Sequence, residues 1–364
     1  MNISIFASIG CQNLGDELIL KNEIKLFENE ALGTINQKTN KKFSFRVFTY
    51  DIKNIFYLKE NIKYLEYFPI GIREKRNILR NFKNLLNLFK TVIWSDIIVI
   101  GGGGIIYDNE VQSNKHPLDQ WVFRNKLFRF FRKKVIFYAI GLNIKNEENY
   151  KKVEKIFKNA TKVFVRDMYS FKLLQSLGIK SEIIEDPVFC DKDINYKMDE
   201  GKSSLVKEIE SNNFSLKDLD NVSLENKNIG ITFRAGYVGK SGNEKIEIFL
   251  IRELVEFLLS KNCKVFFLPH SIHLTDIKSN DLEFYNKIIS KSSFENDVFV
   301  AKNLEEVYNY YTEKKLDLCL AMRLHSMILS QVYEIPFVAF SYSKKTEELV
   351  KRIRSKTPMK ATKN

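Results

Sequence analysis

The chain has 364 residues, of which 44% are hydrophobic, and its 58 lysines and arginines outnumber its 45 aspartates and glutamates. These values exclude a disordered or fibrous protein, and the length is typical of two domains of ~100–200 residues each. The net charge of +13 favours anionic partners such as phosphates, anionic substrates or anionic lipid. A lysine-rich composition that merely solvates the surface explains the same charge equally well.

Short β-rich apolar runs alternate with amphipathic stretches in the first half of the chain. This alternation is typical of an α/β protein with a parallel sheet. Strands are expected at 3–8, 43–50, 97–100, 135–140, 163–165 and 182–184. Helices are expected at 17–27, 73–89, 118–131, 150–158 and 168–177.

The polar segment 191–228 predicts a linker or a surface insertion, and a second alternating series follows it. Its strands are expected at 229–233, 265–268, 298–301, 316–321 and 337–341. Its helices are expected at 246–260, 281–290, 304–312, 325–332 and 346–353. The sequence therefore predicts two doubly wound Rossmann-like domains, 1–190 and 191–364, facing a central cleft that holds the ligand, as in GT-B glycosyltransferases.

The cysteines Cys11, Cys190, Cys263 and Cys319 show no CxxC spacing, which argues against a zinc site or a redox dithiol. Cys263 and Cys319 lie in apolar runs and are expected to be buried thiols, as in a reducing compartment. The sequence shows neither a signal-peptide pattern nor a run of ~20 apolar residues. We therefore expect a cytoplasmic protein.

The segment 10–17 follows the first expected strand and opens the first expected helix. Glycines allow a close approach of the backbone to a ligand, and a helix N-terminus offers N–H groups to anions. Asn13, Gly15 and Asp16 are candidate substrate-binding residues on this ground. Helix capping by Asn13 or Asp16 explains the same pattern equally well.

Four consecutive glycines, 101–104, follow the strand expected at 97–100. Bare backbone at the carboxyl end of a strand suits a phosphate, a carboxylate or a tight contact between domains. Gly102, Gly103 and Gly104 are therefore candidate substrate-binding residues, and a flexible hinge is the alternative.

Two arginines also stand at expected strand ends. Arg166 precedes Asp167 and a helix, and Arg234 ends the strand expected at 229–233. A strand-end arginine can hold an anion with two parallel hydrogen bonds. The alternative for Arg166 is a surface pair with Asp167.

The strongest motif joins Arg323, His325 and, after the next strand, Lys345. All three residues fall at strand ends or helix starts of one βαβ unit. An imidazole can act as acid or base near neutral pH, and arginine and lysine can hold a carboxylate and a phosphate. A lone histidine is more often structural, but the adjoining arginine favours a catalytic role here.

Taken together, these motifs resemble those of the polysaccharide pyruvyltransferase family, in the family's order and over nearly the whole chain. The resemblance is carried by 10–17, 101–104, Arg166–Asp167, Asp186–Pro187, and Arg323–His325 followed by the Lys345 segment. It implies a GT-B-like fold, phosphoenolpyruvate as donor substrate, and a cell-envelope glycan or lipid-linked saccharide as acceptor. It also implies that Arg166, His325 and Lys345 are the functional basic residues, with Arg323 beside the histidine and Lys344 as the alternative lysine.

Metal and cofactor chemistry is not expected, because His116, His270, His273 and His325 show no zinc-ligand spacing. The alternative activity is that of a GT-B glycosyltransferase with a nucleotide-sugar donor. Nucleic-acid binding is not expected, because no RRM, KH, zinc-finger or helix-turn-helix signature is present.

Two further segments, 73–90 and 123–134, combine basic with apolar residues. Such segments can dock on an anionic membrane, where lipid-linked glycans are built. Helices that pack their apolar side on a sheet explain both segments equally well.

Overall fold

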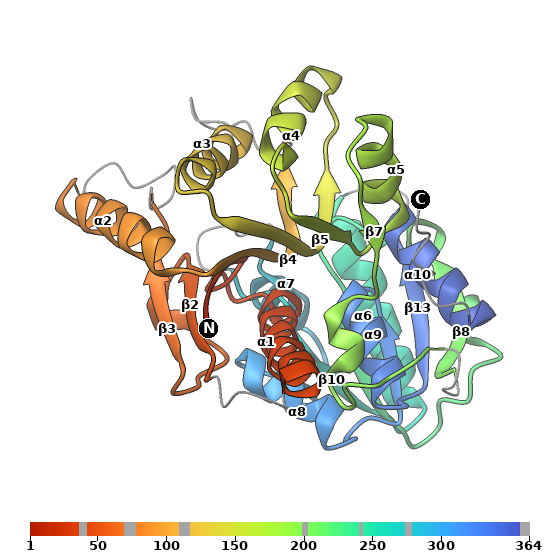
Figure 1. The fold of residues 1–364 in the computed structure, drawn as a ribbon. Coiled ribbons are helices and arrows are strands. Elements are labelled where there is room, and N and C mark those ends of the chain that lie inside the picture. The colour runs from red at the N-terminus through yellow and green to blue at the C-terminus, as the bar shows by residue number, and fades with distance from the viewer. Residues whose placement is uncertain are drawn as a thin grey trace. The chain divides into compact units, whose positions relative to one another are not determined.

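The computed structural model describes residues 1–35, 42–68, 78–108, 117–198, 203–239, 243–273 and 279–356. The chain forms two compact units (Figure 1). Among the described residues, unit 1 comprises Met1–Cys11 and Asp16–Pro187, and unit 2 comprises Gln12–Gly15 and the residues from Val188 to Lys356. That the units are separately folding domains with a boundary near residue 190 stays a proposal.

Unit 1 contains a parallel sheet with the strand order β3-β2-β1-β4-β5-β6-β7. The strands are β1 Asn2–Phe6, β2 Ser44–Thr49, β3 Ile62–Glu66, β4 Ile97–Tyr107, β5 Lys134–Asn143, β6 Lys162–Val165 and β7 Glu182–Ile183. The helices are α1 Leu14–Ile35, α2 Ile78–Trp94, α3 Pro117–Phe130, α4 Tyr150–Phe157 and α5 Met168–Ser176. Part of the helix expected at 73–89 lies outside the described residues, which resume at Ile78.

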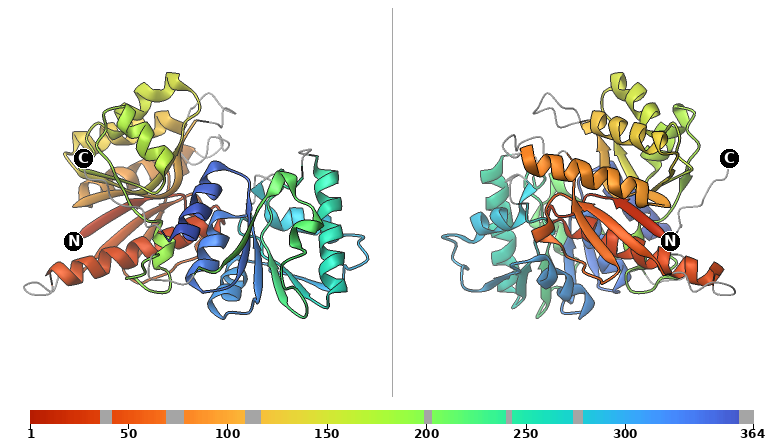
Figure 2. Two further views of the ribbon diagram at one scale, coloured as in Figure 1. Left: turned by 90° about the vertical axis from the view of Figure 1, so that its right-hand side faces the viewer. Right: turned by 60° about the vertical axis from the view of Figure 1, so that its left-hand side comes forward.

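The two faces of this sheet bury different helices, because side chains alternate along each strand. Ile5 and Val47 pack with Leu20 and Ile24 of α1, whereas Phe6 and Phe48 point to the other side. Figure 2 shows α1, in red, on one side of the sheet and the yellow-green helices α3–α5 on the other. Right-handed crossovers produce this arrangement, because the strands are added toward one edge of the sheet from β1 to β3 and toward the other edge from β4 to β7.

Unit 2 contains a second parallel sheet with the strand order β11-β10-β9-β12-β13-β8. The strands are β8 Leu205–Glu210, β9 Asn228–Ile231, β10 Lys264–Phe267, β11 Val298–Val300, β12 Leu318–Ala321 and β13 Phe337–Ser341. The helices are α6 Glu244–Ser260, α7 Asp281–Ile289, α8 Leu304–Thr312, α9 Leu324–Val332 and α10 Lys344–Ser355. The predicted class, with two doubly wound α/β sheets, is therefore confirmed.

Three strands differ from the expectation. β3 was not predicted, and β8 lies within 191–228, which we expected to be a linker or insertion. Both are edge strands, so they bury less apolar surface and carry a weaker apolar signal. β4 does not end at Ile100 but continues through the glycines to Tyr107, with an irregular register between Gly103 and Ile106.

Candidate functional site

In unit 2, the carboxyl ends of three neighbouring strands carry the predicted basic residues, and Ser271 follows a fourth strand beside them. The strands lie in the order β10, β9, β12 and β13, and their ladders are parallel. Ser271 follows β10, Arg234 follows β9, Arg323 and His325 follow β12, and Lys345 follows β13. Parallel strands end at one edge of a sheet, where open α/β folds bind their ligands.

A buried hydroxyl network shapes the turn between β12 and α9. Thr232 Oγ1 accepts a hydrogen bond from the Met322 N–H at 3.1 Å and donates one to Ser326 Oγ at 2.8 Å. Ser326 Oγ in turn donates to the Arg323 carbonyl at 2.6 Å. The end of β9 therefore sets the backbone position of Arg323, the residue that precedes α9.

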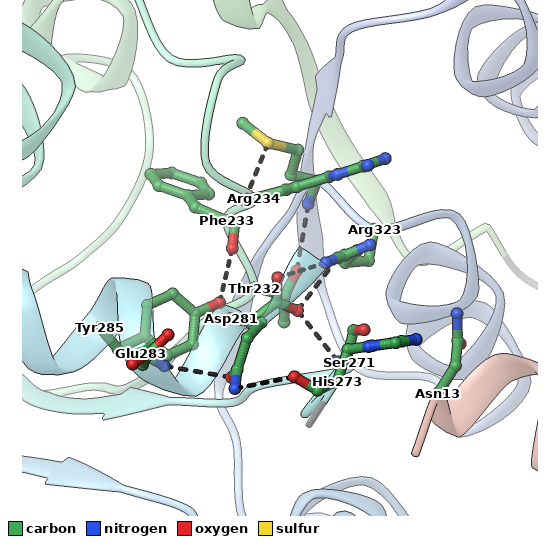
Figure 3. A network of polar contacts seen from close by, with 12 residues as sticks. Asn13, Thr232, Phe233, Arg234, Ser271, His273, Asp281, Glu283, Tyr285 and Arg323 are labelled. Atoms are coloured by element: carbon green, nitrogen blue, oxygen red, sulfur yellow. Dashed lines mark hydrogen bonds and ion pairs between the residues drawn. The ribbon is translucent and has the colours of Figure 1, made fainter. Parts of the chain in front are cut away.

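The Arg323 side chain is held by Asp281, the first residue of α7 (Figure 3). Arg323 Nε lies 3.1 Å from Asp281 Oδ2, and a second bond joins Nη2 to Oδ1. Asp281 Oδ2 also accepts from the Ser271 N–H at 3.0 Å. Burial alone would lower the pKa of Arg323, but the Asp281 carboxylate outweighs burial and raises it. Burial raises the pKa of Asp281, and Arg323 opposes that rise. The two bonds fix Arg323 in one orientation.

Arg234 lies beside this pair. Among the described residues, no carboxylate forms a hydrogen bond or ion pair with it. Its guanidinium stacks over Tyr237 at 5.1 Å, and the backbone N–H of Arg234 donates to Met322 Sδ at 3.3 Å. The buried side-chain Nε has no hydrogen-bond partner within the described chain. Figure 3 shows dashed lines from the Arg323 guanidinium to Asp281 and none from the Arg234 guanidinium.

His325 lies in the first turn of α9 and packs on the backbone of Gly15. A Cβ on Gly15 would lie 1.9 Å from His325 Nδ1, so only glycine fits there. Asn13 bridges to Ser271, and its Oδ1 accepts from the Gly15 N–H at 3.1 Å. The structure thus brings Asn13 and Gly15 to the predicted histidine, and Asn13 also has the capping bond that we considered as its alternative role.

His270 also belongs to this group. Its carbonyl accepts from the Leu14 N–H at 2.9 Å, and its Nε2 lies 3.0 Å from the Tyr311 hydroxyl. Burial lowers the pKa of the His270 imidazole well below its usual range, and nearby Arg323 and His325 lower it further. His270 is therefore a neutral neighbour of the cationic side chains.

Lys345 lies in the first turn of α10, which Ser343 caps. Lys345 is half-buried, whereas Lys344 is exposed. Its helix follows β13, the neighbour of β12 in the sheet. The functional role of Lys345, and the choice between it and Lys344, stays a prediction.

In unit 1, Arg166 pairs with Asp186 and not with Asp167. Arg166 Nη1 lies 2.7 Å from Asp186 Oδ2, and both side chains are largely buried. Asp167 instead caps α5, where its Oδ1 accepts from the Ser170 N–H at 2.8 Å. Burial alone would lower the pKa of Arg166, but Asp186, Asp16 and Asp167 outweigh it and raise the pKa, so Arg166 is a fixed cation among carboxylates.

The glycines of β4 allow α1 to pack directly on the strand. A Cβ on Gly101 would lie 2.3 Å from Glu23 Oε2, and one on Gly103 would lie 2.7 Å from Asp16 Oδ1. A Cβ on Gly102 would likewise meet Ile19, whereas one on Gly104 would meet open space. Close helix packing therefore explains three of these glycines, and their role in substrate binding stays a prediction.

Sequence reasoning missed Asp281, Asp186 and Glu23. Burial raises the pKa of the Glu23 carboxyl well above its usual range, and the Gly102 N–H opposes that rise. Asp186–Pro187 was noted only as part of a motif, and Asp281 only as the start of a helix. An aspartate at the beginning of a helix is ordinarily explained by its favourable interaction with the helix dipole. Its pairing with an arginine 42 positions away cannot be recognised from the neighbouring sequence.

In the ranges that the structure describes, no group of three or more His, Cys, Asp or Glu side chains is arranged as metal ligands. No helix among these residues is both long enough and apolar enough to cross a membrane. The four cysteines form no disulfide with one another, and Cys263 and Cys319 are buried as predicted.

The fold and these strand-end residues define a protein of the GT-B architectural class, with two parallel α/β sheets. The structure is similar to that of a UDP-GlcNAc 2-epimerase from Methanocaldococcus jannaschii, with a TM-score of 0.50, 12% identity, and coverage of 100% of this chain and 94% of the other. It is also similar to the MnaA–UDP structure from S. aureus, with a TM-score of 0.51, 11% identity, and coverage of 98% and 90%. At these identities the similarity concerns the fold alone.

The family is shown by the sequence. The chain belongs to the polysaccharide pyruvyl transferase family, whose model matches residues 13–344. It is therefore a transferase of polysaccharide biosynthesis, as the motifs predicted. A search of curated proteins finds no significant match.

Proposed function

We propose that the protein transfers a pyruvyl group from phosphoenolpyruvate to two hydroxyls of a cell-envelope glycan, forming a cyclic ketal and releasing phosphate. Membership of the family favours this reaction over the nucleotide-sugar transfer that we considered as the alternative. The structural observation that supports an anionic donor is Arg234. Its buried Nε has no hydrogen-bond partner in the described chain, so a ligand anion is a suitable acceptor for it.

The cations of unit 2 suit the two anionic groups of phosphoenolpyruvate. Asp281 takes two of the five N–H donors of Arg323, which leaves donors on the same guanidinium for a ligand. Helix α9 begins directly after Arg323, and the dipole of a helix favours an anion at its N-terminus. Lys345 adds a further cation at the neighbouring strand end.

The reaction consumes one phosphoenolpyruvate and two hydroxyls. A proton adds to the methylene carbon, which becomes a methyl group and leaves the central carbon electrophilic. One hydroxyl oxygen attacks this carbon, the bond to the phosphate oxygen breaks, and the second hydroxyl then closes the ketal. The two hydroxyl protons are balanced by the new methyl hydrogen and by the proton on the released phosphate.

His325 is the residue that we assign to proton transfer. Its ring is fixed against Gly15 and lies near the positive end of α9, next to the arginine that would bind the donor. An imidazole can deliver a proton to carbon and accept one from a hydroxyl near neutral pH.

The proposal is tested by phosphate release from phosphoenolpyruvate with a panel of glycan acceptors, and UDP-sugars serve as the alternative donors. We expect acceptor-dependent release, lowered by ~10²–10⁴-fold in His325→Ala. Release of a nucleotide from a UDP-sugar, or near wild-type turnover of the variant, would contradict the proposal.

The predicted role of Arg166 in donor binding has its own test by calorimetry. Arg166→Ala should weaken phosphoenolpyruvate binding, and Arg166→Lys should rescue it poorly because the planar guanidinium is lost. Normal binding by both variants would leave Arg166 as a structural partner of Asp186.

A further inference from the structure

Helix α2 has apolar residues on two sides, and only one side faces the core. Leu88 and Val92 are buried against the sheet. The other side exposes apolar residues spaced at three- and four-residue intervals, of which Leu79 is 83% exposed and Phe82 60% exposed. The exposed set is Ile78, Leu79, Phe82, Leu86 and Ile93. Leu85 and Phe89 of the same helix are half-buried.

Helix α3 lies beside α2 and continues this pattern. Lys133 Nζ, just after α3, donates to the carbonyls of Ile93 and Ser95 at 2.9 and 2.7 Å. Phe130 is 80% exposed, and Phe123 is also exposed. Phe128 of the same helix is buried in the core. We call the exposed sides of α2 and α3 the α2–α3 face.

The charge of the α2–α3 face is strongly one-sided. The segments 78–94 and 117–134 contain nine lysines and arginines and a single acidic residue, Asp119. Of the nine, Arg124 is buried and Arg80 pairs with Glu66, so the exposed positive charge comes from the others. Lys83 and Lys90 are exposed between the apolar residues of α2, and Lys126 and Arg129 are exposed on α3. Exposed aromatic and aliphatic side chains interspersed with cations are typical of helices that lie in a membrane interface.

We propose that the α2–α3 face docks the protein on an anionic lipid surface, with the cations at the headgroups and the apolar side chains in the headgroup–acyl boundary. A second copy of the chain fits this face poorly, because a symmetric dimer would place two strongly positive surfaces against each other. The proposal goes beyond the transferase activity and does not depend on the identity of the donor.

Vesicle co-sedimentation of the full chain tests the proposal, with phosphatidylcholine vesicles that either contain or lack phosphatidylglycerol. We expect binding to the anionic vesicles only, weakened by salt because exposed charges are screened beyond ~10 Å at 0.1 M ionic strength. Removing the cations with Lys83→Gln, Lys90→Gln, Lys126→Gln and Arg129→Gln should weaken binding by roughly fivefold for each cation, the equivalent of about 1 kcal/mol.

The apolar contribution is tested by the double variant Leu79→Gln, Phe82→Gln. Both side chains are exposed, so the fold should tolerate the change, and we expect binding to fall by at least about tenfold. The matched control is Ile246→Gln, Phe249→Gln, which removes two exposed apolar residues at the same spacing from α6 in unit 2. This control should bind as the wild type does.

Three results would overturn the proposal. They are no binding to anionic vesicles at low salt, equal binding to neutral vesicles, and unchanged binding of the Leu79→Gln, Phe82→Gln variant. Light scattering adds a fourth, since a wild-type dimer that this variant dissociates, without vesicle binding, would assign the face to a second copy.

Discussion

At the scale of single residues, the candidate site depends on side chains that are fixed before any ligand binds. Asp281 holds Arg323 with two bonds, and Gly15 provides the space that the His325 ring fills. Such fixed groups lose little conformational entropy when a ligand binds. Substitutions of the positioning residues Asp281 and Gly15 should therefore affect the site as substitutions of Arg323 and His325 do.

The fit between Gly15 and His325 predicts a steric conflict in Gly15→Ala. The new Cβ would lie 1.9 Å from His325 Nδ1, so the ring or the backbone must move. We expect a loss of about 1–3 kcal/mol in the free energy of unfolding, measured by urea denaturation, and turnover lowered toward that of His325→Ala.

A double-mutant cycle identifies the cause of this loss. In the His325→Ala background the ring is absent, so Gly15→Ala should cost much less stability than it does alone. An equal loss of stability in the wild-type and His325→Ala backgrounds would show that the steric conflict with His325 does not cause the loss.

The buried carboxyl of Glu17 should make the stability of unit 1 depend on pH. Its carboxyl accepts from the Gly10 N–H at 2.8 Å, and burial raises its pKa from 4.5 to about 7. The stabilising contribution of the neutral carboxyl is fully present below pH 4.5 and is lost as the pH rises through about 7. The loss amounts to up to about 3 kcal/mol.

Glu17→Gln keeps an oxygen for the Gly10 N–H and cannot ionise. We expect its free energy of unfolding to be close to that of the wild type near pH 4.5 and higher than that of the wild type at pH 8. Urea denaturation at the two pH values measures the difference. The same difference between the two proteins at both pH values would rule out titration of Glu17 in this range.

At the scale of elements, the packing of α1 on β4 predicts that the four glycines 101–104 differ in how well they tolerate substitution by alanine. A Cβ at Gly101 would meet the carboxyl of Glu23, which is fully buried and cannot turn into solvent. Gly101→Ala should therefore cost about 1–3 kcal/mol of stability.

Gly104→Ala is the matched control for stability in this comparison. Its Cβ would meet open space, so the change should be neutral or stabilising by up to about 1 kcal/mol, because alanine restricts the unfolded chain. Equal losses in the two variants, measured by thermal unfolding, would show that packing on α1 does not explain the run.

At the scale of the whole molecule, we predict that activity needs no divalent metal. The described residues hold no ligand cluster, and the protein's own arginines and lysine can bind both anionic groups of phosphoenolpyruvate. Phosphate release should be unchanged after treatment with a chelator. Full loss of activity that one added metal restores would contradict this prediction.

Much of the architecture could be predicted from local pattern. The helix at Leu304–Thr312 and the strand at Phe337–Ser341 have the predicted bounds, because a buried parallel strand is a continuous apolar run and Asn303 marks the start of the helix. The edge strands β3 and β8 were missed. In β8, lysine and glutamate stand among the apolar residues, so the run is short and its signal is weak.

The sequence by itself determined the two α/β units, the family and the strand-end positions of its basic residues, because these depend on residue order and local periodicity. Only the tertiary structure decided that Asp281 holds Arg323, that Asp186 and not Asp167 holds Arg166, and that one apolar side of α2 is exposed. The paired side chains lie 42 and 20 positions apart. A contact of that kind depends on how strands are ordered in a sheet and which face each helix covers, and the local pattern of a segment does not contain this information.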